Sequence, residues 1–400
     1  MKQILYLLLP LLLLYACQDS RPKVLEIDFS TNYKFAAEIE ERLRTDTMPW
    51  KYQSAAADYA NKGDYKNALL QWDLGMRPQE RSYSSHEVDS VMRTYTLVNA
   101  GEYIAREAQK TRVVIINEAH HNSMHRAFTR PLLRELFALG YSNLGLEALH
   151  TDSALNGRGY PIQSSGYYLQ EPQFALLVRD ALDLGYHVFA YEHTDEGGGK
   201  PREIGQAKNI QKVIDARPNE KFLIHCGFAH ALEGNYSPWE KAMAGRLAEY
   251  TGIDPLTINQ EFYSEKSKPA YDHPLLKALE LEEASVLLDQ NSKAISYERG
   301  EAHTDIAVLH PTTQYLDGRP HWLFANGNKK VSISLKDVDI VYPVMVMAFQ
   351  KGEDIREAIP ADITEVQHKD EPCTLGLKPG EYTIVVYNGT QAMQFEKRVK

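Results

Sequence analysis

Between residues 112 and 263, short apolar runs alternate with longer amphipathic segments. A short apolar run bounded by turn signals is typical of a buried strand, and apolar residues at 3.6-residue spacing are typical of a helix. Buried strands that alternate with helices form a mainly parallel sheet covered on both faces, so the predicted class is α/β with a three-layer core. Strands are predicted at 113–117, 144–148, 188–191, 222–225 and 256–259, and helices at 125–139, 171–184, 202–216 and 238–250.

The regions on either side of this core have different patterns. Residues 34–110 read as helices, and the Gly63-Asp64 break within residues 50–72 resembles a single tetratricopeptide hairpin. One such repeat cannot bury its own apolar face, so we expect a helical hairpin packed on the next domain. Residues 281–400 contain Val-, Ile- and Tyr-rich runs between turn signals, which predicts an antiparallel, sandwich-like β module. The α/β domain is accordingly placed at 111–280.

The first residues resemble a bacterial export signal. Lys2 precedes an apolar run at 4–15 that is too short to span a bilayer. The Leu-Tyr-Ala-Cys sequence at its end resembles a lipobox, in which cleavage before Cys17 is followed by lipidation of that cysteine. We expect a signal peptide at 1–16, a tether at 17–33 and a lipid anchor in the inner or outer membrane of a bacterial cell envelope. An ordinary export signal with a chance cysteine is the alternative.

Charge and cysteine content exclude two classes of protein. The chain has 44 Lys and Arg residues against 54 Asp and Glu residues, a formal net charge of −10. Without a basic excess to release counterions from phosphate backbones, nucleic acid is excluded as the principal partner. Three cysteines make no disulfide framework. A bridge between Cys226 and Cys373 is permitted by export, but their spacing gives it no support.

Glutamate and histidine residues gather where the predicted strands end. Eight of the 14 histidines lie within residues 120–230. Ligands bind at the carboxyl ends of the strands in open parallel sheets, so these side chains are expected to converge at one rim. Taken singly, any of them could equally be a solvated loop residue or a helix cap. They are Glu118, His120 and His121 after the first strand, Glu147 at the end of the second, Glu192 and His193 after the third, and His230 after the fourth.

The order of these residues resembles the erythromycin esterase-like family. Segment 227–234 also resembles the Gly-x-x-His motif of the wider superfamily, which holds ChaN-type haem-binding lipoproteins and the TraB/Tiki proteins, some of them metal-dependent proteases. The resemblance covers about residues 111–263, and Asn117 stands where the family has glycine. The matched residues are Glu118 with His121 at the end of a strand, Arg130 in the next helix, Glu147 after the second strand, Arg202-Glu203 at a helix start, and Trp239 with Met243 and Gly245 near the end of the core.

The resemblance implies a hydrolase of an ester or amide, with a small molecule or a peptide as substrate. His121 would be the general base that activates water, because imidazole titrates near neutral pH. No G-x-S-x-G motif occurs in the sequence, which favours direct water attack over an acyl-enzyme. The other implied roles are Glu118 or Glu147 holding the base, Arg130 stabilising the oxyanion, His230 serving the leaving group, and His120, Glu192, His193 and Arg202 binding substrate.

Three alternatives stay open. Glu118, His121 and His230 could bind Mn, Co, Fe or Zn and leave one position for water. The protein could instead capture haem or another small ligand without catalysis, with His or Tyr as the axial group of a haem. It could also be a scaffold whose helical hairpin or β module binds a protein partner.

Overall fold

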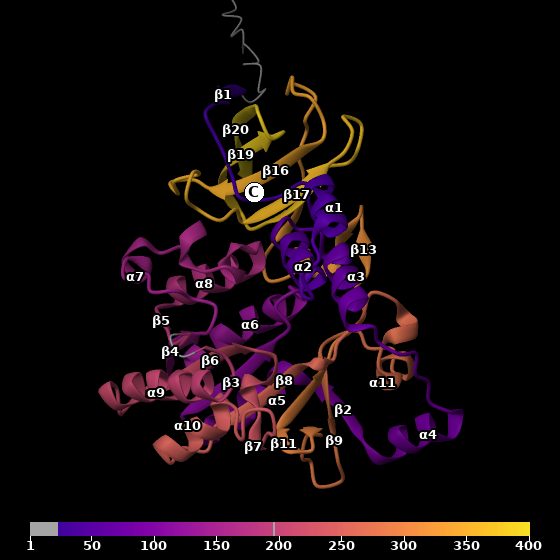
Figure 1. Cartoon of the computed structure of the whole chain (residues 1–400), viewed down its shortest axis with the longest axis vertical. Coiled ribbons are helices and arrows are strands. Elements are labelled where there is room, and N and C mark those ends of the chain that lie inside the picture. The colour runs from indigo at the N-terminus through magenta and orange to yellow at the C-terminus, as the bar shows by residue number, and fades with distance from the viewer. Residues whose placement is uncertain (1–22, 195–196) are drawn as a thin grey trace, which may run out of the picture.

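The predicted α/β class is confirmed by the computed structural model, which describes residues 23–194 and 197–400. Within this part of the chain, the central sheet has eight strands in the order β2-β9-β12-β8-β3-β6-β4-β5. Figure 1 shows this sheet below the C-terminal module. The pairs from β12 to β5 are parallel, and β9 and β2 join one edge antiparallel. The strands are β2 (Thr96–Asn99), β3 (Val113–Glu118), β4 (Tyr141–Leu146), β5 (His187–Ala190), β6 (Lys221–Gly227), β8 (Leu256–Tyr263), β9 (Ser285–Leu288) and β12 (Ile306–Leu309).

Helices cover both faces of this sheet because its strands are apolar on both sides. In β3, Val114 and Ile116 face one helical layer, and Val113 and Ile115 face the other. All four side chains are buried. The first layer consists of α5 (Ala100–Glu107), α6 (Met124–Ala138) and α8 (Pro172–Leu184), and the second of α9 (Lys200–Ala216) and α10 (Met243–Thr251).

The predicted domain boundary after residue 280 does not coincide with the boundary of the sheet. Strands β9 and β12 pair within the central sheet, and β2 comes from the segment predicted to be wholly helical. Val286 and Val308 are fully buried in the same core as the parallel strands. The prediction failed because turns rather than helices connect these strands, a pattern that also suits a separate antiparallel module.

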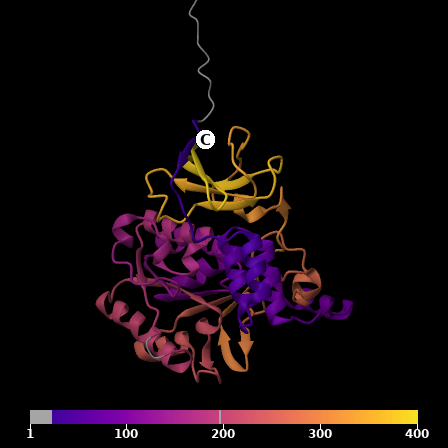
Figure 2. The same ribbon diagram turned by 45° about the horizontal axis from the view of Figure 1, so that its top comes forward.

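The C-terminal module is an antiparallel sandwich at one end of the molecule (Figures 1 and 2). Its larger sheet has the order β1-β20-β19-β16-β17, and β15 pairs with β18. Buried side chains from both sheets, among them Val346, Ile384 and Leu375, form one core. The strands are β1 (Leu25–Ile27), β15 (Lys329–Ser332), β16 (Val344–Gln350), β17 (Asp362–Val366), β18 (Thr374–Leu377), β19 (Gly380–Tyr387) and β20 (Ala392–Val399).

Residues 25–33 belong to this module, so the prediction of a tether up to residue 33 is wrong. Strand β1 pairs with β20, and Phe29 and Tyr33 are buried in the module's second core. The Phe29 ring meets the Tyr387 ring edge-on at 5.6 Å. The predicted signal peptide, Cys17 and the start of the tether lie outside the described residues. In the described ranges, no helix has the length and apolar character needed to cross a bilayer.

The helical hairpin of α2 (Lys51–Asn61) and α3 (Tyr65–Met76) connects the C-terminal module to the rim of the central sheet (Figure 2). Gly63, between the two helices, has a φ of 78°, and a Cβ there would lie 2.2 Å from the Ile363 carbonyl oxygen. The buried Lys62 ammonium pairs with Glu365 at 2.6 Å. At its other end the hairpin places Trp72 against His121. The hairpin therefore packs on the α/β domain, as expected, and on the C-terminal module as well.

Cys226 and Cys373 are both free and buried. Burial raises the pKa of the Cys226 thiol well above its usual value, so this residue is a buried thiol at neutral pH. The structure therefore gives no support to a disulfide between these two cysteines.

Stability is expected to fall as pH rises from about 4.5 to about 7 because of Glu233. Burial raises the pKa of Glu233 to about 7, and Asp305 adds to the effect. The folded protein keeps the proton in this range while the unfolded chain loses it, at a cost of roughly 1–3 kcal/mol above pH 7. Glu233→Gln keeps the acceptor for the Thr257 hydroxyl, which lies 2.8 Å away. The free energy of unfolding, measured with urea, should differ less between pH 5 and pH 8 in Glu233→Gln than in the wild type. An equal difference in both proteins would contradict the assignment.

Candidate functional site

The first cluster of the rim is built around Glu118, the last residue of β3. Arg126 Nε and Nη2 donate to its two carboxylate oxygens at 2.6 and 2.7 Å. His120 Nδ1 lies 2.8 Å from Glu118 Oε1. Burial raises the pKa of Glu118, but the Arg126 guanidinium outweighs it and holds this pKa well below the usual range. Glu118 is therefore a carboxylate, and it fixes the orientation of the His120 ring.

Arg126 was not predicted, although it is central to this cluster. Its side chain is fully buried, and its third nitrogen, Nη1, donates to Glu171 Oε2 at 2.9 Å. Glu171 also caps α8 by accepting from the backbone N–H groups of Gln173 and Phe174. Arg126 thus connects the end of β3 to the start of α8.

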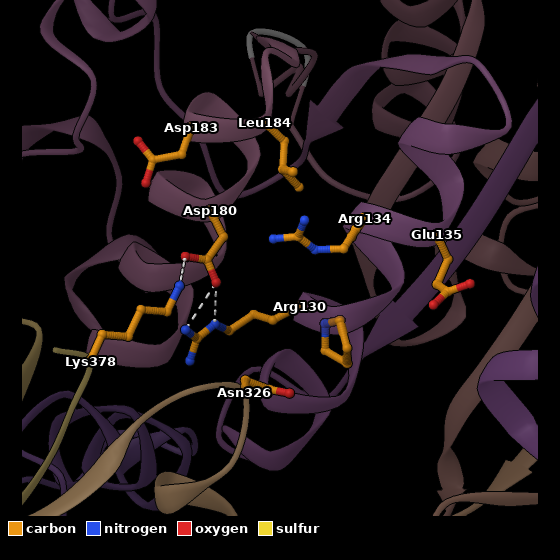
Figure 3. A pocket seen from close by; sticks show the side chains of 9 residues that line it. Arg130, Arg134, Glu135, Asp180, Asp183, Leu184, Asn326 and Lys378 are labelled. Atoms are coloured by element: carbon orange, nitrogen blue, oxygen red, sulfur yellow. Dashed lines mark hydrogen bonds and ion pairs between the residues drawn. The ribbon is translucent and has the colours of Figure 1, made fainter.

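Arg130, the predicted oxyanion stabiliser, does not reach the rim, and that role is therefore wrong. It lies one helical turn beyond Arg126, about 6 Å along the axis of α6. Its Nε donates to Asp180 Oδ2 at 3.0 Å, and Lys378 of the C-terminal module donates to Asp180 Oδ1 at 2.5 Å (Figure 3). These residues line a separate cavity of about 480 Å³ between α6, α8 and that module.

A second cluster forms around Glu147, directly after β4. Its Oε2 accepts from the Gly227 backbone N–H at 2.5 Å, and its Oε1 accepts from Arg202 Nη2 at 2.6 Å. His230 Nε2 lies 3.0 Å from Arg202 Nη1 and 3.5 Å from Glu147 Oε1. Burial raises the pKa of Glu147, but His230, His120 and Arg202 outweigh it and lower this pKa.

His230 has a partner in either protonation state. Its Nδ1 lies 2.8 Å from the buried Glu203 carboxylate. When His230 is neutral, Nε2 accepts from Arg202, and when it is protonated, Nε2–H faces Glu147. Burial lowers the pKa of His230, but Glu147 and Glu203 outweigh it and raise this pKa. The Trp239 ring stacks on His230 at 5.1 Å. Glu203 was matched only as part of a helix start, and its contact with His230 was not predicted.

Glu192 belongs to this cluster and His193 does not. Glu192 accepts from Arg202 Nε at 2.9 Å and also pairs with Arg202 Nη2. The His193 ring instead packs on α9, where a Cβ on Gly205 would lie 2.1 Å from it. His193 therefore has a packing role, and its predicted role in substrate binding is not supported.

The two clusters meet at Gly227, the last residue of β6. A Cβ on Gly227 would lie 2.4 Å from His120 Nε2 and 3.4 Å from Glu147 Oε2. The His120 ring can rest on this backbone only because the residue is glycine. The structure thus brings together Glu118, His120, Glu147, Glu192, Arg202 and His230 of the predicted set.

His121, the predicted general base, points away from both clusters. Its ring stacks on Trp72 at 4.0 Å, and its buried Nδ1 has no hydrogen-bond partner within the described residues. Burial lowers the pKa of His121 well below its usual value. It lines a cavity of about 300 Å³ between the hairpin and the rim. The other lining residues are Trp50, Gln53, Ser54, Ala57, Trp72, His120, Tyr167, Tyr168 and Phe228.

Asn117 stands where the erythromycin esterase-like pattern has glycine, and its side chain makes two hydrogen bonds here. Its side-chain amide donates to the Phe228 carbonyl at 2.8 Å and accepts from the Gln260 backbone N–H at 2.9 Å. Phe228 has a φ of 44°, a strained conformation for a residue with a side chain. Asn117 therefore holds the strained turn that places the Phe228 ring in the cavity.

The predicted metal ligands do not converge. Both oxygens of Glu118 are bound by Arg126, His121 faces Trp72, and His230 lies in the other cluster. Among residues 23–194 and 197–400, no group of three or more His, Cys, Asp or Glu side chains is arranged to hold a metal ion. The predicted set of Glu118, His121 and His230 therefore does not fit a metal centre.

A haem is also a poor fit. Of the rings in the cavity wall that could act as axial ligands, His121 is stacked on Trp72 and His120 on Tyr168 at 3.8 Å, while Tyr167 meets Tyr168 edge-on. The cavity volume of about 300 Å³ lies at the lower end of the range for small-molecule sites.

Comparisons with known proteins identify no family. No family model matches the chain, and no curated protein matches it. RRSP, a MARTX toxin effector domain from Vibrio vulnificus, is 15% identical over 55% of this chain and 48% of that chain, with a TM-score of 0.29. The type III effector HopBA1 is 12% identical over 52% and 93% of the two chains, with a TM-score of 0.31. The C-terminal region of Pasteurella multocida toxin is 11% identical over 83% and 51%, with a TM-score of 0.30. The chain spans about half the length of the first of these structures, and such TM-scores carry no argument about function.

Proposed function

We propose that this protein is a lipid-anchored hydrolase of the bacterial cell envelope that cleaves an ester or amide by direct water attack, with His120 as the general base. One observation carries the assignment. Of the described rim histidines, His120 alone both lines the cavity and is held by a carboxylate. His121 lines the cavity without a carboxylate partner, and His230 has carboxylate partners but does not line it.

The geometry around His120 suits proton transfer. The carboxylate of Glu118 favours the tautomer with a proton on Nδ1, which leaves Nε2 free to accept one. Nε2 faces Gly227 beside Glu147. A water molecule that reaches Nε2 from the cavity gives its proton to Nε2 while its oxygen attacks the carbonyl carbon of the substrate.

His230 does not line the cavity, so its proposed role is to orient the leaving-group side of the site through Glu147. Its raised pKa favours the imidazolium, and Glu203 holds its ring through Nδ1. When the C–O or C–N bond breaks, the leaving oxygen or nitrogen takes the electron pair and a proton from Nε2 of the His120 imidazolium formed in the first step, which restores the neutral base. Arg202 is a positioning residue, because its guanidinium is bound by Glu147, Glu192 and His230.

The experiment is a panel of small-molecule esters, amides and peptides offered to the purified mature protein. We expect turnover of at least one ester or amide, and a fall in kcat/KM of more than about tenfold in Glu147→Gln, because this variant removes the charge next to His230 and Gly227. The melting temperature of the variant serves as its control.

Capture of a ligand without catalysis is the competing outcome. A wild-type protein that turns over no member of the panel but shifts the Soret band of added haem would contradict the hydrolase. Turnover that is unchanged in a folded Glu147→Gln variant would contradict the location of the site.

A further inference from the structure

The cavity between the hairpin and the rim has the chemistry of a substrate pocket. We propose that the hydrolase takes an uncharged aromatic ring of its substrate into this cavity, so that its substrates are esters or amides whose carbonyl lies next to an aromatic ring. This inference rests on the proposed function, because it is the His120 base that makes the cavity part of an active site.

The walls of the cavity are mostly aromatic. Trp50 and Trp72 come from the hairpin, Tyr167 and Tyr168 precede α8, and Phe228 follows β6. His120 lies in the same wall, so a group in the cavity is next to the proposed base. At about 300 Å³ the cavity is large enough for a group of roughly ring size and small for a whole drug-sized molecule.

The arrangement of the rings favours a flat group. Trp72 is nearly parallel to His121 and to Phe228, with interplanar angles of 11° and 10°. His120 and Tyr168 form a second stack with an angle of 15°. The two stacks meet edge-on, because His120 and Phe228 are inclined by 89°. Both stacked and edge-on contacts are favourable between aromatic rings, and the exposed rings of Trp50 and Tyr167 in the same wall offer them to an added ring.

The charges around the cavity favour an uncharged group. Among the described residues, no Asp, Glu, Lys or Arg lines it. The nearby Glu118 and Glu147 carboxylates are bound by Arg126 and Arg202. Burial lowers the pKa of His121 well below its usual value, so this ring is neutral at physiological pH. Among the lining residues, a cation would meet aromatic faces without a counter-charge, and an anion would meet no cation. The Lys266 ammonium acts on His121 from outside the wall and helps to lower its pKa.

Two features show that the fold maintains this cavity at a cost. Trp50 and Tyr167 leave 53% and 44% of their surface exposed and line the same cavity, and apolar side chains exposed together are typical of interaction sites. Phe228 contributes its ring from a strained backbone that Asn117 holds in place. Exposed aromatic rings and backbone strain both concentrate at binding sites.

The test is a calorimetric titration of the mature protein with two amides of similar size, benzamide and cyclohexanecarboxamide, and with benzyltrimethylammonium. We expect benzamide to bind at least about fivefold more tightly than each of the others, as stacking on an aromatic ring predicts. Equal or tighter binding of cyclohexanecarboxamide would overturn the preference for a flat group. Equal or tighter binding of benzyltrimethylammonium would show that the cavity takes cations and overturn the preference for an uncharged one.

Variants of α3 locate the binding. Trp72→Ala is expected to weaken benzamide binding at least about fivefold, and Trp72→Phe, which keeps a ring, by less. Leu74→Ala is the matched control, because Leu74 lies two residues away on the same helix and is 48% exposed. If Trp72→Ala and Leu74→Ala bind benzamide equally well, the cavity is not the site.

Turnover separates this inference from the proposed function. If benzamide binds as expected but no ester or amide is hydrolysed, the cavity stands as a binding site and the hydrolase fails. If esters are hydrolysed with the same kcat/KM for methyl benzoate and methyl cyclohexanecarboxylate, the hydrolase stands and the aromatic specificity fails.

Discussion

Replacing His120 by alanine is expected to lower kcat/KM by a factor of about 10²–10⁴, the usual contribution of a general base. The loss should appear in kcat, because the base acts only as the transition state forms. The fold should persist, since Glu118 keeps both hydrogen bonds to Arg126 when His120 is removed. Steady-state kinetics on the best substrate of the panel, with a melting curve of each protein, measures both quantities.

Two neighbouring histidines provide the controls for this prediction. His193→Ala should leave kcat within a few-fold of wild type, because the His193 ring packs on Gly205 rather than in either cluster. His121→Ala should raise KM more than it lowers kcat, because His121 lines the cavity without a carboxylate partner. A large loss of kcat in His121→Ala with near-normal turnover in His120→Ala would restore the role that the sequence first suggested for His121.

The strand ends were predictable from the sequence, and the contacts between their side chains were not. The carboxyl ends of parallel strands must meet at one rim, so Glu118, Glu147 and His230 could be grouped without any coordinates. Which of two adjacent histidines points inward depends on the turn after β3. That turn is set by packing of His120 on Gly227 and of His121 on Trp72, contacts that involve residues distant in the sequence.

Two of the three arginines of α6 illustrate the same limit. Arg126 and Arg130 are four residues apart, so helical periodicity places them on one face and cannot choose between them. The family pattern selected Arg130, but only Arg126, in the first turn of α6, is near enough to the end of β3 to bind Glu118. The contact of the hairpin with the C-terminal module was also out of reach, because nothing local to residues 50–72 indicates that Gly63 packs against Ile363.

Arg126→Ala is expected to destabilise the protein by about 3–5 kcal/mol, the typical effect of removing one partner from a buried ion pair. The change leaves the Glu118 and Glu171 carboxylates, both fully buried, without their shared guanidinium. Arg130→Ala is the matched control on the same helix. Its partner Asp180 keeps Lys378, and the Asp180 side chain is 16% exposed, so the loss should be smaller. Urea unfolding of the two variants gives the comparison, and equal losses would contradict the special role of Arg126.

The pH dependence of the stability lost in Arg126→Ala tests whether the Glu118 carboxylate causes that loss. In the wild type, the lowered pKa of Glu118 contributes stability above the pKa of the unfolded chain, near 4.5, and this contribution is lost as pH falls. Without Arg126, burial is left to raise the pKa of Glu118, so the variant loses stability as pH rises. The gap between wild type and Arg126→Ala should therefore be wide at pH 7 and narrow toward pH 4. In the double variant Arg126→Ala/Glu118→Gln, no charge titrates at position 118. The difference between its free energy of unfolding and that of the wild type should therefore depend less on pH. A gap that stays constant from pH 4 to pH 7 in both variants would mean that lost packing of the arginine stem, rather than an unpaired carboxylate, destabilises the protein.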